Sequence, residues 1–179
     1  MRKNAMFPGV KAGETFTVAG IEFFRFGEKD GKVAVTPVHP LFRSSIGDCA
    51  DLKQSKILRR LNKEFLPKIE EAVGAENVCA FATDLMTLDG LKTYGEIESK
   101  ICLPTLTFYQ ENVEIYDQHK TDRWWWLATA WSAKPHYESE LLLCVSPSGG
   151  IFNYSCGLSN GVRPILIFES SIFESSEEI

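Results

Sequence analysis

The stretch RWWWLATA, residues 123–130, places three of the four tryptophans of this 179-residue chain side by side. The run is β-prone, and successive side chains of a strand point to opposite faces of a sheet. Trp124 and Trp126 are therefore expected on one face, with Trp125 and Leu127 on the other. Large aromatic side chains mainly supply buried area. We predict that these three tryptophans are structural and fill a core. Trp131 follows in a polar loop, where exposure is equally expected.

Further β-prone runs stand at both ends of the chain, with helical periodicity between them. The helical pattern covers residues 51–69, beginning at Asp51 and ending at Pro67, and a second short helix is expected over 105–116. This order predicts an α+β fold with mixed or antiparallel sheets, one or two flanking helices, and paired N- and C-terminal strands. The expected strands are Glu14–Val18, Ile21–Phe26, Lys32–Val38, Trp124–Ala130, Glu140–Ser146, Ile151–Tyr154 and Val162–Phe168.

Length and charge narrow the possible functions. The chain suits one domain, residues 13–168, with an N-terminal arm over 1–12 and an acidic tail over 169–179 that is expected to fray. Its net charge is -5, and its basic residues cluster only on the short helix face of Lys56, Arg59 and Arg60, which disfavours nucleic acid. No apolar run suits membrane insertion and no signal peptide is recognisable, so a cytoplasmic protein is expected.

Cysteine and histidine spacing gives no sign of a metal or cofactor. The five cysteines are an odd number without a CxxC pair, which fits neither a disulfide framework nor a zinc site. His39, His119 and His136 are far apart in sequence and have no acidic or cysteine companion at metal spacing. We therefore expect reduced cysteines, no bound metal and no cofactor.

Several segments taken in order carry a family resemblance. They are GETFTVAGIEFFRFGEKDGKVAV (13–35), SKILRRLNKEFL (55–66), KICLPTLTFYQEN (100–112), WWWLAT (124–129) and SPSGGIFNYSCGLSNGVRPIL (146–166). Together they resemble a bacterial and phage-associated domain of unknown function, over residues 13–168. More distantly, the chain resembles the C-type-lectin-like fold of formylglycine-generating enzymes and phage receptor-binding proteins. The family typically has Arg-Ser after Trp-Trp-Leu, whereas this chain has Ala128-Thr129, so any role of that arginine is absent.

The resemblance implies a C-type-lectin-like fold with a recognition surface over residues 129–160, and a virion-associated protein if a phage encodes it. That region mixes amphipathic aromatics with small polar groups, which suits a protein or glycan partner. Solvated loops without a partner are the equal alternative. Calcium-dependent sugar binding is disfavoured, because the sequence lacks the loop motifs of calcium-binding lectins. The candidate ligand-binding residues are Trp131, His136, Tyr137, Asn153, Tyr154 and Asn160.

Two other functions stay open at this point. An oxidoreductase similar to formylglycine-generating enzymes would use Cys144 and Cys156, although the apolar run LLLCVS favours a buried, unreactive Cys144. An architectural subunit of a phage or surface assembly would expose an apolar patch. We favour a non-catalytic protein.

Arg163 lies in an apolar strand and is interpreted as structural, because a buried guanidinium needs a carboxylate or several carbonyls. Asp122 is its expected partner.

Overall fold

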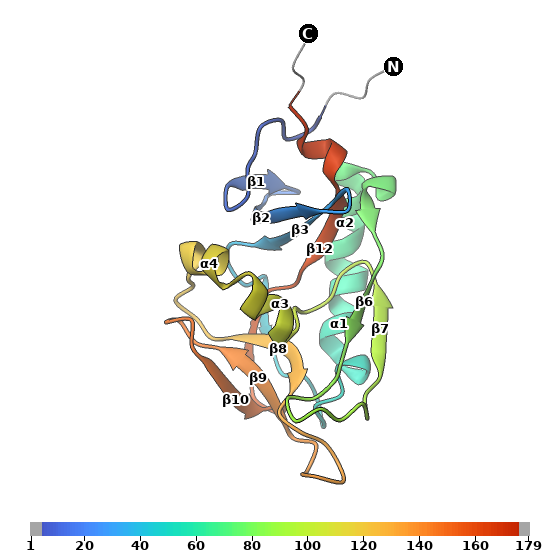
Figure 1. Cartoon of the computed structure of the whole chain (residues 1–179). Helices are drawn as coiled ribbons and strands as arrows, with labels where there is room; N and C mark the ends of the chain where they lie inside the picture. Colours follow the sequence, from blue (N-terminus) through green and yellow to red (C-terminus); the bar gives the residue numbers. More distant parts are fainter. Residues whose placement is uncertain (1–4, 176–179) are drawn as a thin grey trace.

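The computed structural model describes residues 5–175 and confirms the α+β class (Figure 1). The strands are β1 (Thr15–Val18), β2 (Ile21–Lys29), β3 (Lys32–Pro37), β4 (Phe42–Ser44), β5 (Val78–Cys79), β6 (Phe81–Asp84), β7 (Glu96–Ser99), β8 (Trp125–Ala130), β9 (Leu141–Val145), β10 (Ile151–Ser155), β11 (Asn160–Val162) and β12 (Leu166–Glu169). The α-helices are α1 (Lys56–Arg60), α2 (Leu66–Val73), α3 (Leu106–Glu111) and α4 (Val113–Tyr116). A π-helical turn, η2 (Leu61–Phe65), joins α1 to α2, and short 3-10 turns lie at η1 (Leu52–Gln54), η3 (Ala75–Asn77), η4 (Asp117–His119) and η5 (Ser170–Phe173).

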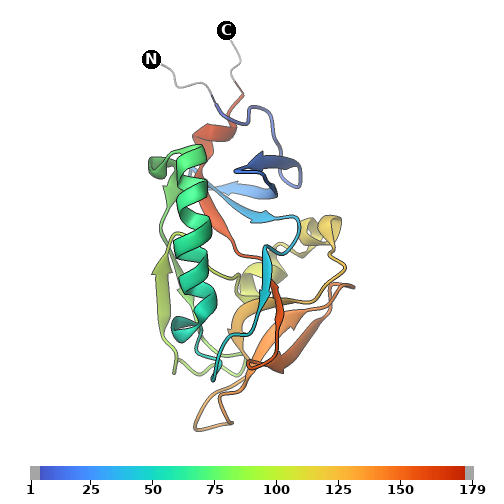
Figure 2. The same ribbon diagram turned by 180° about the vertical axis from the view of Figure 1, so that it is seen from behind.

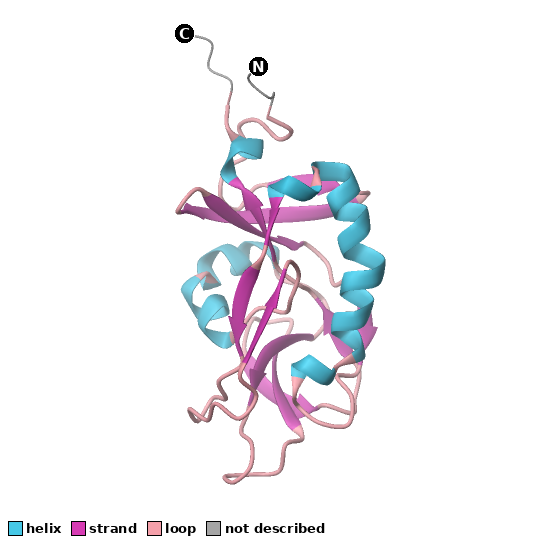
Figure 3. Ribbon diagram, turned by 90° about the vertical axis from the view of Figure 1, so that its right-hand side faces the viewer, coloured by secondary structure: helices cyan, strands magenta, loops and turns pink. Residues whose placement is uncertain are grey.

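Two five-stranded sheets lie at opposite ends of the molecule, with the long helical segment along their side (Figure 3). The first sheet has the order β1-β2-β3-β12-β5 and is antiparallel throughout. Its β3–β12 contact confirms the predicted pairing of N- and C-terminal strands. The second sheet has the order β10-β9-β8-β11-β4 and contains one parallel pair, β8 with β11. β6 and β7 form a separate two-stranded sheet.

The helix over the predicted 51–69 segment does not stop at Pro67 as expected, and Figure 2 shows it as one continuous column to Val73. Proline has no N–H for the bond to the residue one turn earlier, and its ring clashes with that carbonyl in a regular helix. Here the wider turn η2 comes immediately before, and Pro67 stands at the start of α2. The helix ends instead at Gly74, whose φ of 89° few other residues adopt.

The predicted strand Val162–Phe168 is two strands in two sheets. β11 pairs with β8 and β4 in the second sheet, and β12 pairs with β3 and β5 in the first. Arg163 lies at this crossing and is 1% exposed. The short linker therefore ties the two sheets together at a buried charge.

Within residues 5–175, carbonyl oxygens and no carboxylate satisfy Arg163. Its Nε donates to Pro37 O at 2.8 Å, and one terminal nitrogen donates to Val38 O at 2.9 Å and His119 O at 2.8 Å. The predicted partner, Asp122, is wrong, because that residue is exposed and makes no such contact. The guanidinium carbon also lies 5.1 to 5.5 Å from the ring centres of Phe24, Tyr116 and Trp125. Three acceptors and three aromatic rings thus replace the expected ion pair.

Both ends of the described chain pack on the first sheet. Phe7 N donates to Ile172 O at 2.8 Å, and the rings of Phe7 and Phe173 lie 5.9 Å apart. Ile172 and Phe173 are each 5% exposed, so the tail predicted to fray from residue 169 is packed through η5. The outermost parts of the predicted arm and tail, 1–4 and 176–179, lie outside the described residues. Within 5–175, no helix has the length and apolar character needed to cross a membrane.

Candidate functional site

The three consecutive tryptophans alternate in the predicted way, but only two of them are buried. Trp126 is fully buried in the main core, and its indole nitrogen donates to Ser44 O at 2.9 Å. Trp125 is 2% exposed and lies in the smaller core beneath α3 and α4. Trp124, predicted to be structural, is 40% exposed, because it precedes β8 and its ring lies toward the edge of the second sheet.

An exposed aromatic face forms where Trp124 meets the edge strand β10. Phe152 is 51% exposed and its ring centre lies 5.1 Å from that of Trp124. Tyr154 is 41% exposed and lies 6.1 Å from Trp126. We call Trp124, Phe152 and Tyr154 the aromatic face. Four of the five residues of β10 are exposed and none is charged, which is unusual because natural edge strands are normally protected by charges, prolines or bulges.

The backbone of β10 presents a free edge to solvent. Ser146 N donates to Gly150 O, and Cys156 N donates to Glu140 O. Gly150 and Cys156, which flank β10, therefore each form a hydrogen-bonded pair with a residue that flanks β9. Because such pairs alternate along an antiparallel ladder, the N–H and C=O groups of Ile151 and Asn153 point away from β9. Among residues 5–175, these outward groups have no backbone partner.

The hairpin that carries this edge is held firmly. Tyr109 on α3 donates to Gly149 O at 2.7 Å, and Gly149 N donates to Ser146 O at 2.9 Å within the turn. Gly149 has a φ of 92°, which favours glycine at this corner. Ser146 Oγ accepts from Gly150 N at 3.1 Å. The edge strand is thus positioned before any partner arrives.

The predicted ligand-binding residues fall into separate places. Trp131, His136 and Tyr137 are exposed on the loop between β8 and β9, whereas Asn153 and Tyr154 are exposed on β10. No contact found within the described chain joins these two groups. Asn160 is 7% exposed on β11, so its predicted place on the surface is wrong.

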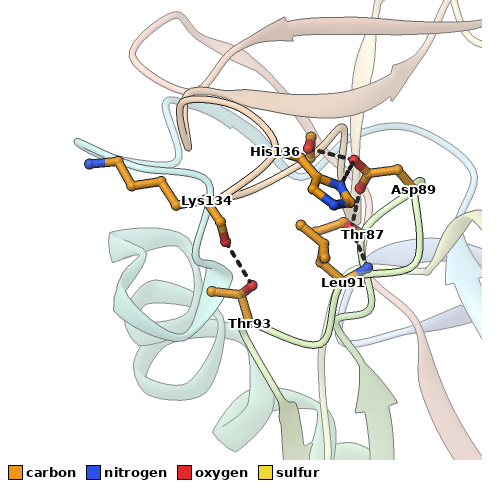
Figure 4. A network of polar contacts seen from close by, with 7 residues as sticks. Thr87, Asp89, Leu91, Thr93, Lys134 and His136 are labelled. Carbon is orange, nitrogen blue, oxygen red and sulfur yellow. Dashed lines mark hydrogen bonds and ion pairs between the residues drawn. The ribbon is translucent and has the colours of Figure 1, made fainter.

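A second polar cluster joins the loop after β6 to the loop after β8 (Figure 4). The carboxylate of Asp89 accepts from Thr87 at 2.5 Å and from Ser132 at 2.6 Å, and His136 Nδ1 lies 3.0 Å from it. These hydrogen bonds, led by that from Ser132, hold the pKa of Asp89 well below its usual value. Asp89 was not predicted, because two of its three partners, Ser132 and His136, lie more than forty positions away in sequence.

This cluster lacks the geometry of a nucleophilic triad. In such a triad the serine hydroxyl bonds to the histidine, whose other nitrogen bonds to the acid. Here Ser132 and His136 both bond to the same oxygen of Asp89. The arrangement anchors the 131–139 loop, which carries Trp131 and Tyr137.

Cys144 and Cys156 are not placed as a reactive pair. Cys156 stands opposite Glu140, four positions along β9 from Cys144, which at strand spacing separates the two by roughly 13 Å. A disulfide needs Cα atoms within about 7 Å. Burial also raises the pKa of the Cys144 thiol to about 11 and raises that of Cys156. All five cysteines are free.

Comparison with known proteins identifies no relative from which a function could be inferred, so the function is argued from the geometry of the site. No family model, no curated protein and no solved structure matches the chain. Within residues 5–175, no group of three or more His, Cys, Asp or Glu side chains is arranged to hold a metal ion. The C-type-lectin-like assignment therefore stays a prediction.

Proposed function

We propose that this chain is a non-catalytic recognition domain that binds a protein partner through β10. The observation that carries the proposal is an uncharged edge strand with outward N–H and C=O groups beside exposed Trp124, Phe152 and Tyr154. An extended segment can add to such an edge through backbone hydrogen bonds, while rings on one face contact its alternate side chains. Aromatic residues at the centre of interfaces contribute most of the binding energy.

The sequence-based expectation allowed a glycan as well as a protein. The aromatic face alone could stack on a sugar ring, since tryptophan and tyrosine are amphipathic. Sugar hydroxyls can also bond to backbone groups, but only an extended polypeptide matches donors and acceptors that repeat at strand spacing along the edge of β10. The free backbone edge therefore favours a polypeptide.

The test compares variants that remove either the edge or the rings. Peptides would first be selected for binding to the wild-type chain from a displayed random 12-residue library. Asn153→Pro removes one N–H that points away from β9, so it breaks no bond to that strand. Proline is tolerated at such positions of an edge strand. Asn153→Thr, which keeps the N–H, is its control. Removing one hydrogen bond and crowding the edge should weaken peptide binding about tenfold.

The ring variants complete the test. Phe152→Ala should weaken the same peptides by about thirtyfold, as expected for an interface aromatic. If Asn153→Pro leaves binding unchanged while Phe152→Ala abolishes it, the rings bind without strand addition and a glycan array becomes the relevant screen. If neither variant alters binding of any selected peptide, β10 is not the recognition surface.

An architectural subunit is the second candidate, and the apolar side chains on this surface favour it. Ile151, Phe152 and Leu158 are 37%, 51% and 49% exposed, which matches the apolar patch expected of such a subunit. A permanent partner would cover them, and the isolated chain would then self-associate. Analytical ultracentrifugation separates the two cases: recognition predicts a monomer, and assembly predicts a concentration-dependent mass that Phe152→Ser abolishes.

A further inference from the structure

A groove of about 550 Å³ runs along α1 and η2 beside β4, far in the fold from β10. Its size falls in the range of small-molecule sites. Its walls are unlike the rest of this acidic chain, because four of the six lining side chains are cationic. The lining residues are Ser44, Lys56, Arg59, Arg60, Lys63 and Glu64.

Most of these cations have no counterion. Arg60 pairs with Glu64, with Nε and the carboxylate oxygen 2.6 Å apart. Within residues 5–175, Lys56, Arg59 and Lys63 make neither an ion pair nor a side-chain hydrogen bond. The cations follow one another at spacings of three and four along the helix, where like charges are neighbours and repel. The groove thus holds three uncompensated positive charges.

The order of charged residues along this helical segment destabilises the helix. A helix favours anions at its N-terminus and cations at its C-terminus. Here Lys56 is the first residue of α1 and the other groove cations follow within two turns, whereas Glu70 and Glu71 stand in the last turn of α2. A charge pattern that breaks a local rule in this way is expected at functional sites.

Arg60 is already fixed in position. Its guanidinium carbon lies 4.0 Å from the ring centre of Phe42, and that ring stacks on Phe65 with centres 5.5 Å apart. Its Nε is bonded to Glu64, which leaves the terminal nitrogens to donate to an anionic group with little further loss of freedom. The Ser44 hydroxyl on the wall already donates to Ser45 O at 2.9 Å, so the cations supply the donors of the groove.

We propose that this groove binds a small polyanion carrying two or more phosphate groups. Lys56 and Lys63 are two turns apart, roughly 10 Å along the helix, so one phosphate cannot reach both ends. A chain of phosphates can. A long nucleic acid fits less well, because the whole chain has five excess negative charges and the groove three excess positive ones. Eight excess negative charges therefore surround the groove and repel an extended polymer.

The test is isothermal titration calorimetry with inorganic tripolyphosphate at low ionic strength. The double variant Arg59→Gln with Lys63→Gln should bind tripolyphosphate about tenfold more weakly than the wild type, or worse. The matched control, Lys53→Gln with Lys68→Gln, removes two positive charges that lie close in sequence to the groove but do not line it. It should bind tripolyphosphate within about twofold of the wild-type affinity. All four side chains are exposed, so neither variant disturbs the core.

Three results would overturn the proposal. The wild type could fail to bind tripolyphosphate, or both double variants could lose binding equally, which would indicate only general attraction. A single-stranded 20-nucleotide DNA could also bind more tightly than tripolyphosphate with the same dependence on Arg59 and Lys63, which would assign the groove to nucleic acid. Peptide binding at β10 should be equal in both double variants.

Discussion

Replacing Arg163 with methionine should be among the most destabilising single changes in this chain. Methionine has a similar length and no charge, so it fills the space but donates no hydrogen bond. The carbonyl oxygens of Pro37, Val38 and His119 would each lose a donor that now lies 2.8 to 2.9 Å away. Two of these carbonyls lie at the end of β3, on its last residue Pro37 and on the next residue Val38, and the third lies at the end of η4. The substitution therefore affects two separate segments of the fold at once, residues 37–38 and residue 119.

The magnitude follows from opposing contributions. Three acceptors would be left without donors, one in a buried hydrogen bond and two in partly buried ones, at a cost of about 6 kcal/mol or about 2 kcal/mol each. Loss of the contacts between the cation and the three rings adds about 1 kcal/mol. The variant no longer has to bury a charge: burial lowers the pKa of Arg163 to about 10, which corresponds to about 3 kcal/mol. The expected loss in the free energy of unfolding is about 4 kcal/mol.

Urea unfolding followed by tryptophan fluorescence measures this loss directly, since Trp125 lies beside the guanidinium. Arg43→Met is the control, because Arg43 is exposed on β4 and should change stability by less than about 0.5 kcal/mol. Arg163→Lys should fall between the two, because one ammonium cannot reach all three carbonyls. A loss below about 1 kcal/mol for Arg163→Met would refute the reasoning, since the carbonyls would then be satisfied without the guanidinium.

Three further changes test the site and its support. Asp89→Asn should raise hydrogen–deuterium exchange of the 131–139 loop at pH 7, and unchanged exchange would exclude the anchoring role. The hydrogen bonds to Asp89 hold its pKa below the ordinary value of about 4. Their contribution to loop stability is therefore complete above that pH and is lost as the pH falls below it. Protection of the wild-type loop from exchange should be equal at pH 7 and pH 5. The buried Cys144 thiol, whose pKa is raised to about 11, should react with an Ellman-type reagent at pH 8 only after unfolding; fast native labelling mapped to it by mass would revive a redox function. Gly161→Ala should lower stability by about 1–3 kcal/mol, because an added Cβ would lie 2.8 Å from a backbone oxygen; Gly27→Ala, which meets open space, is its control, and equal stability of the two would show that the strand can shift.

The secondary structure was largely predictable from sequence wherever the pattern was local. The alternation of Trp125 and Trp126 between two cores follows from the two-residue period of a strand. The continuation through Pro67 could not be predicted, because it depends on a π-helical turn that leaves no clear sequence pattern. The division of Val162–Phe168 was missed for a different reason. Both halves are β-prone, and only the buried position of Arg163 shows that the chain changes sheets there.

The candidate site was predictable in part. Asn153 and Tyr154 are exposed as expected, and that expectation came from the recognition surface over 129–160 that the family resemblance implies. Phe152 was missed, since an apolar aromatic in a strand is normally buried, and nothing in the sequence shows that β10 is the last strand of its sheet. Asn160 was misplaced because a polar residue near a glycine suggests a loop. Its burial comes from β4, which pairs with it and was not predicted.

The order of the second sheet decides how the two proposed surfaces relate. β10 and β4 are its opposite edges, with three strands between them, so strand spacing separates the edges by roughly 19 Å. The aromatic face lies at the first edge, and the basic groove adjoins Ser44 at the second. Effects of changes so far apart normally add. A variant carrying both Phe152→Ala and the Arg59/Lys63 replacements should therefore lose peptide and tripolyphosphate binding independently. If one ligand instead strengthened binding of the other, the two surfaces would be coupled through the sheet and would form one binding site that spans it from edge to edge.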